Sequence, residues 1–158
     1  MASVFYGPAQ ARITRTPITF DTSLPTAGLY QTESPIHKIA SAILPSLFQP
    51  GGKITINPEG TADLSKTTRH EEIHAALDKL NQSGKLDELA AQNPYYSQLK
   101  PNVDVGDMPA EMPAYIGTAD NAELGIPDIL SNKYYGKLVQ QLQQLDPNLA
   151  KIYQRLKK

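Results

Sequence analysis

The chain has 158 residues, 20% of them charged, and a formal net charge of −1. That length fits a single domain with one hydrophobic core, and a near-neutral balance without blocks of like charge gives no basis for nucleic acid or an anionic membrane as a partner. The absence of cysteine excludes disulfides, a thiolate metal site and a cysteine nucleophile.

The sequence predicts neither a targeting segment nor a membrane span. The first residues, Met1 to Pro8, lack the basic region and the apolar run of a signal peptide. No stretch approaches the roughly 18 apolar residues that cross a bilayer as a helix. We therefore expect a soluble protein, cytoplasmic by default, without a membrane partner.

The N-terminal part is rich in proline and has few helix signals. β-forming residues at 12–15 and 18–20 predict one or two short strands, or extended pieces packed on the core, within residues 1–33. Ser34-Pro35 then resembles an N-cap followed by the favoured first-turn proline, and apolar residues follow at helical spacing. This pattern predicts a first helix over about 35–44.

The middle of the chain predicts a strand followed by a long helix. Residues 53–57 alternate polar and apolar side chains, which is typical of a half-buried strand. A helix is predicted over about 63–80, closed near Gly84, and a short helix is predicted over 86–92.

The C-terminal half predicts further helices. One is expected over about 110–118, another region opens at Ile126-Pro127, and an amphipathic helix with a break near Asp146-Pro147 ends the chain. We interpret the apolar stripe of this last helix as the domain's own core rather than as a partner surface. Its members are Leu138, Leu142, Leu145, Leu149 and Ile152. The fold class is therefore α+β, helix-rich with a small sheet, in one domain over residues 1–158.

Residues 70–74 read His70-Glu71-Glu72-Ile73-His74, a His-Glu-x-x-His pattern inside the helix predicted at 63–80. A four-residue spacing places both imidazoles on one helix face, where they can bind the same metal ion. Glu71 projects from the flank of that face. Its carboxylate can take a proton from a metal-activated water without being a ligand.

Histidine and glutamate also meet by chance on solvated helix faces, which is the alternative interpretation of this pattern. Against it, the motif holds two of the three histidines in the chain, lies well inside a predicted helix and follows a short strand. His37, the third histidine, is interpreted as an ordinary residue of the helix predicted at 35–44.

The motif and the order of the elements resemble those of the zincin metallopeptidases. In that family a backing helix and an edge strand precede the helix with the two histidines, and residues 35–44, 53–57 and 63–80 would take those parts. The resemblance covers about residues 35–118. It implies a zinc-dependent endopeptidase that acts on a peptide or protein, with Zn²⁺ held by His70 and His74, Glu71 as the general base, and substrate added as a strand beside the edge strand.

A catalytic zinc site needs a third protein ligand, which must be an oxygen because no histidine follows His74 and no cysteine exists. Glu111 is the preferred candidate, since its segment is similar to the glutamate helix of gluzincins and is flanked by the small residues Ala110 and Ala114. The match is incomplete, because Tyr115 stands where many gluzincins have an aspartate that orients a histidine.

Two alternatives for the third ligand remain open. Asp120 lies in Gly117-Thr118-Ala119-Asp120, a string similar to the aspartate-bearing element of aspzincins, although the residues that follow depart from that family. Asp104 and Asp107 are the remaining carboxylates considered.

Further expectations concern function. A tyrosine hydroxyl often stabilises the developing oxyanion, and Tyr115 is slightly favoured because it lies one turn after Glu111. The other tyrosines considered are Tyr95, Tyr96, Tyr134 and Tyr135. Residues 1–30 are hypothesised to lie near the site and keep the enzyme latent. The competing function is a non-catalytic, degenerate zincin that serves as a structural or interaction module in a phage particle or toxin system.

Overall fold

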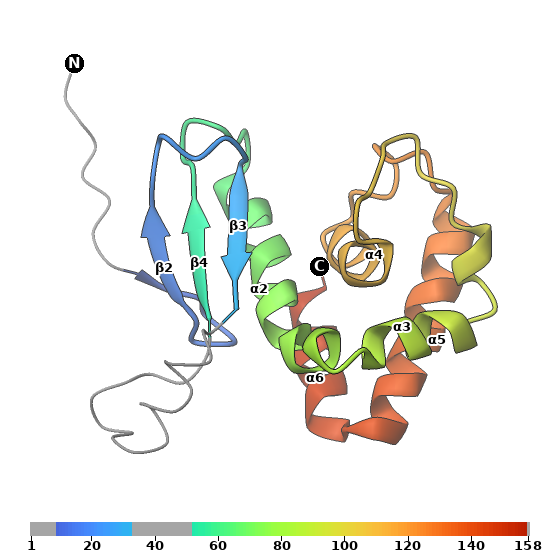
Figure 1. Cartoon of the computed structure of the whole chain (residues 1–158). Coiled ribbons are helices and arrows are strands. Elements are labelled where there is room, and N and C mark those ends of the chain that lie inside the picture. The colour runs from blue at the N-terminus through green and yellow to red at the C-terminus, as the bar shows by residue number, and fades with distance from the viewer. Residues whose placement is uncertain (1–8, 33–51, 158) are drawn as a thin grey trace. The chain divides into compact units, whose positions relative to one another are not determined.

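The computed structural model describes residues 9–32 and 52–157 of the chain (Figure 1). The helix predicted at 35–44 and His37 lie outside the described residues. The chain divides into two compact units, residues 1–75 and 76–158, and the division falls inside the long helix. Helices and a small sheet are both present, which confirms the α+β class.

The first unit contains a small mixed sheet in the order β1-β2-β4-β3 (Figure 1). Its strands are β1 (Ala9–Gln10), β2 (Pro17–Phe20), β3 (Gly28–Gln31) and β4 (Lys53–Ile56). β2 runs parallel to β4, with Ile18 opposite Ile54, whereas β1–β2 and β3–β4 are antiparallel pairs. The side chains of Ile18, Ile54 and Ile56 are buried against one another on one face of the sheet, and Phe20 and Tyr30 pack beside them.

The structure confirms the strand predicted at 53–57 and corrects its place in the sheet. β4 lies between β2 and β3, so among the described strands it is an inner strand rather than an edge strand. Residues 9–32, the described part of the chain before it, supply three strands, not one or two. Residues 12–14 form a turn instead of a strand, because Ala11 N–H bonds to the Thr16 carbonyl and Arg15 adopts a positive φ of 62°.

Helix α2 (Leu64–Gln82) confirms the helix predicted at 63–80. The Asp63 carboxylate accepts a hydrogen bond from the Lys66 amide, as an N-terminal cap does. Ile73 and Leu77, one turn apart, are buried. The helix ends before Gly84, which takes the left-handed conformation that glycine adopts without steric cost.

The second unit is helical in the part of the chain that the structure describes. After the end of α2 come α3 (Lys85–Gln92), a short 3₁₀ turn η1 (Tyr96–Gln98), α4 (Met108–Gly117), α5 (Asp128–Leu145) and α6 (Pro147–Leu156). These bounds confirm the helices predicted at 86–92 and 110–118 and the break near Asp146-Pro147. None of the helices in the described ranges is long and apolar enough to cross a membrane.

The apolar stripe predicted over the last helix is only partly the core of this unit. Leu138 and Leu142 are buried, but Leu145 is 44% exposed. The break at Asp146 changes the helical phase, because the Asp146 carboxylate caps a new helix by accepting from the Asn148 and Leu149 amides. The buried face of α6 is consequently formed by Ala150, Tyr153 and Leu156.

Candidate metal centre

His70 and His74 lie one turn apart on α2 and present their rings to each other. The two Nε2 atoms are 3.3 Å apart, and the ring planes meet at 65° with centroids 5.0 Å apart. Both side chains are half-buried. The helix thus directs one nitrogen of each imidazole toward a common point, as the sequence spacing predicts.

Glu111 lies in the first turn of α4, a helix whose residues Ala110, Met112 and Ala114 are buried. Pro113 is inside this helix. The buried Tyr153 hydroxyl donates a 3.0 Å hydrogen bond to the Pro113 carbonyl. The segment that carries Glu111 is therefore fixed to α6 by a polar contact in addition to its apolar packing.

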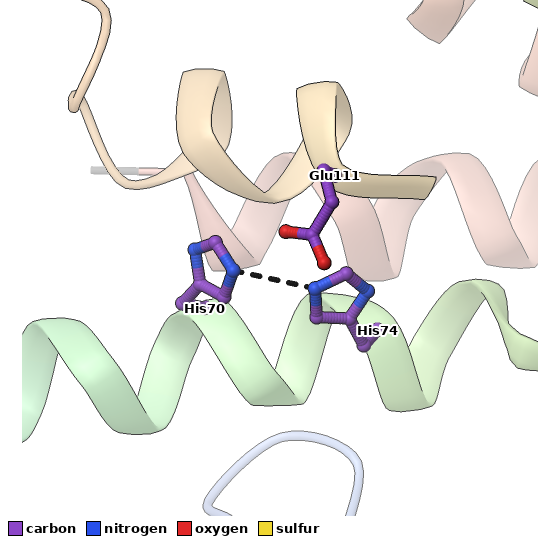
Figure 2. A group of neighbouring side chains, drawn as sticks. All are labelled: His70, His74 and Glu111. Atoms are coloured by element: carbon purple, nitrogen blue, oxygen red, sulfur yellow. Dashed lines mark hydrogen bonds between the residues drawn. The ribbon is translucent and has the colours of Figure 1, made fainter. Parts of the chain in front are cut away.

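Figure 2 shows the carboxylate of Glu111 pointing toward the two imidazoles. His70, His74 and Glu111 each offer one ligand atom, and these three atoms lie within 4.8 Å of one another. All three side chains are half-buried. Such a group, partly shielded yet open to solvent, could hold a metal ion.

The donor set fits zinc. Catalytic zinc sites commonly use two imidazoles and one carboxylate and leave a fourth position for water. With zinc–nitrogen distances of about 2.0–2.1 Å, adjacent nitrogens of a tetrahedral site lie about 3.3–3.4 Å apart. The 3.3 Å between the two Nε2 atoms equals that separation.

The other carboxylates considered as third ligand are not in this group. Among the residues that the structure describes, the group of potential ligands contains Glu111 and none of the three aspartates. Asp120 accepts a 3.0 Å hydrogen bond from the Thr118 hydroxyl. Asp104 and Asp107 lie on the exposed loop before α4, where Asp107 is its N-terminal flanking residue.

Glu71 is 7% exposed and lies against the start of β3. A Cβ atom placed on Gly28 would be 2.8 Å from its Oε1 atom and 2.9 Å from its Cγ atom. The side chain predicted to be the general base is thus confined by a strand backbone. No local pattern predicted a role for Gly28, because this contact joins residues far apart in the chain.

Glu72 is the residue whose importance the sequence did not indicate. It is 3% exposed, and its Oε1 atom accepts from the Ile13 amide at 2.8 Å, the Thr14 amide at 2.6 Å and the Thr14 hydroxyl at 3.2 Å. Glu72 therefore ties the turn between β1 and β2 to α2, one residue from Glu71. A second acid in the motif was the only local signal, and such an acid is usually solvated.

The tyrosines differ in their surroundings. Tyr134 is buried, which raises the pKa of its phenol. Burial likewise raises the pKa of Tyr135, whose ring packs on Tyr153. Tyr95 lies near the Lys133 ammonium, and Tyr96 begins η1. Tyr115 is half-buried on α4, one turn after Glu111, and stays a prediction as oxyanion donor.

Comparisons with known proteins add no relative. No family model matches the chain, and no curated protein or solved structure is significantly similar to it.

Proposed function

We propose that the protein is a zinc-dependent metallopeptidase in which His70, His74 and Glu111 bind the ion and Glu71 is the general base. The observation that carries the proposal is the 3.3 Å separation of the two imidazole Nε2 atoms on α2. The two nitrogens are within hydrogen-bond distance of each other, and their separation also matches that of adjacent ligands of one zinc ion. The carboxylate of Glu111 completes a donor set of two nitrogens and one oxygen.

Each residue has a distinct part in hydrolysis of a peptide bond. Bound zinc supplies Lewis acidity, which acidifies a water molecule and polarises the scissile carbonyl. His70 and His74 remain neutral ligands, and Glu111 offsets part of the positive charge. Glu71 accepts the proton of the attacking water and then delivers it to the departing amine, so the carboxylate returns to its starting state.

The experiment that tests this proposal separates metal binding from catalysis. Wild type, Glu71→Ala and the control Glu59→Ala, which alters an exposed glutamate on a turn, are depleted of metal and reloaded with zinc. Cleavage of fluorescein-labelled casein is then measured beside zinc content. We expect zinc in all three proteins and cleavage by wild type and Glu59→Ala only. Loss of a general base lowers turnover by about 10²–10⁴-fold.

Other outcomes would reject the proposal in recognisable ways. Zinc bound by all three proteins, with no cleavage by any, would assign the chain to the non-catalytic class of zincin-like modules. No zinc bound by wild type would reject the metal centre itself. Equal cleavage by wild type and Glu71→Ala would remove Glu71 from the mechanism.

A further inference from the structure

Gly28 occupies a place where a side chain cannot fit. A Cβ atom there would lie 2.8 Å from Oε1 and 2.9 Å from Cγ of Glu71, and 2.9 Å from Cγ2 of Thr67. All three distances are shorter than real Cβ contacts allow. The first residue of β3 therefore approaches α2 with nothing but its backbone.

Backbone conformation does not explain this glycine. Among the described residues, Gly84 and Gly125 are the glycines with a positive φ, and Gly28 is not one of them. Gly28 pairs with Ile56 in an ordinary antiparallel ladder. An alanine could adopt this backbone, so the requirement for glycine at position 28 is one of space.

The neighbours of Gly28 differ in how readily they could yield. Thr67 is held by a 2.6 Å hydrogen bond between its hydroxyl and that of Thr61, so its methyl group has a fixed position. Glu71 has the longer side chain, and its Oε1 atom, the nearest to the added Cβ, is at the far end of it. A group added at Gly28 would therefore have to displace the Glu71 side chain as well as the Thr67 methyl group.

We infer that Gly28 is the positioning residue for the general base. Because it has no side chain, the backbone of β3 comes close enough to α2 to confine the Glu71 carboxylate. This inference rests on the proposed function. A carboxylate on a chain with several rotatable bonds must be restricted to one place to meet the attacking water efficiently, and a misplacement of about 1 Å can cost 10²-fold in rate. The backbone of β3 provides that restriction on one side.

The test compares Gly28→Ala with Gly136→Ala. Gly136 is on α5, and a Cβ atom there would meet no atom within 4 Å. For each zinc-loaded protein, three quantities are measured: turnover of fluorescein-labelled casein per bound zinc, the zinc dissociation constant in a competition titration, and the midpoint of urea unfolding. We expect Gly28→Ala to lower turnover per zinc by about 10–100-fold. Its zinc dissociation constant should stay within about twofold of wild type, because the ligands are untouched.

Without a second variant, reduced turnover caused by misfolding could not be told from reduced turnover caused by a misplaced Glu71 carboxylate. Thr67→Ser removes the Cγ2 methyl group and keeps the hydroxyl that bonds to Thr61. The double variant Gly28→Ala/Thr67→Ser thus leaves only Glu71 in the way of the added methyl group. It should fold, bind zinc and remain impaired, whereas Thr67→Ser alone and Gly136→Ala should turn over at the wild-type rate.

The inference is overturned if Gly28→Ala or the double variant has wild-type turnover per zinc, or if activity falls only in proportion to zinc content or folded fraction. Failure of the proposed function is distinguishable, since it would be seen as absence of cleavage by zinc-loaded wild type.

Discussion

Glu71 and Glu72 are adjacent buried carboxylates on α2 with different surroundings. Glu71 lies against the bare backbone of Gly28, whereas Glu72 accepts three hydrogen bonds from Ile13 and Thr14. A helix turns by about 100° per residue, so neighbours on it face different partners. The first carboxylate is the one proposed as general base, and the second fixes the helix to the chain before β2.

Replacing Glu72 by alanine should destabilise the protein substantially. The Ile13 and Thr14 amides would lose a charged acceptor, and bonds of this kind contribute about 1.5–3 kcal/mol. We expect Glu72→Ala to lower the free energy of unfolding by about 2–3 kcal/mol, measured by urea denaturation. Glu72→Gln is the control: its amide oxygen can still accept, so it should lose less. Equal losses in both variants would show that the hydrogen bonds at Oε1 are not what stabilises this turn.

At the scale of elements, helix α4 ends in a strained residue. Ala119 follows the C-terminal flanking residue Thr118 and has a positive φ of 61°. Glycine is the usual residue there, because an L side chain in this conformation clashes with the following carbonyl. The helix that carries Glu111 is thus terminated at some cost in free energy.

Ala119→Gly should relieve this strain. We expect the free energy of unfolding to rise by about 0.5–1 kcal/mol, less any entropy that glycine adds to the unfolded chain. The matched control is Ala91→Gly in α3, where the backbone is helical and glycine should cost about 0.5–1 kcal/mol relative to alanine. Thermal unfolding measures both. A destabilising Ala119→Gly would mean that φ at this position is not strained.

Local patterns in the sequence predicted several elements well. The alternation at 53–57 predicted β4, helical spacing with Gly84 beyond it predicted α2, and Asp146-Pro147 predicted the break between α5 and α6. These signals are contained within a few residues. His70 and His74 were predictable for the same reason, because a four-residue spacing fixes their relation on a helix.

Features that depend on distant residues were not predictable. β3 has little alternation of its own, and its pairing with β4 places β4 inside the sheet rather than at its edge. Leu145 was assigned to the core because helical spacing was extended across a break that shifts the phase. The contacts of Glu72 with Thr14 and of Glu71 with Gly28 join segments whose proximity no local pattern encodes.

At the scale of the whole molecule, buried tyrosines make the free energy of unfolding fall at alkaline pH. Burial raises the pKa of the Tyr134 and Tyr153 phenols well above their ordinary value of 10.0. In the unfolded chain both phenols lose their protons near pH 10, whereas in the folded protein they keep them. Above that pH the unfolded state binds fewer protons than the folded state. The free energy of unfolding is therefore unaffected by these phenols below about pH 10 and falls as the pH rises above it.

We therefore expect the free energy of unfolding to decrease steadily above pH 10. Two phenols should titrate only together with loss of helical circular dichroism, as followed by phenolate absorbance. Tyr153→Phe should reduce the slope of stability against pH by about one proton. Ionisation of both phenols in a protein that is still helical would contradict this.

The central claim is that His70, His74 and Glu111 bind one zinc ion, and a zinc titration tests it most directly. Metal-free wild type, Glu111→Ala and Asp120→Ala are titrated against a chromophoric chelator of known zinc affinity. We predict one zinc per wild-type chain and an affinity that falls by more than about 100-fold in Glu111→Ala, beyond the effect of residues that only orient a ligand. Asp120→Ala should lose less than about tenfold. Wild type that binds no stoichiometric zinc, or a Glu111→Ala variant that binds it as tightly as wild type, would contradict the claim.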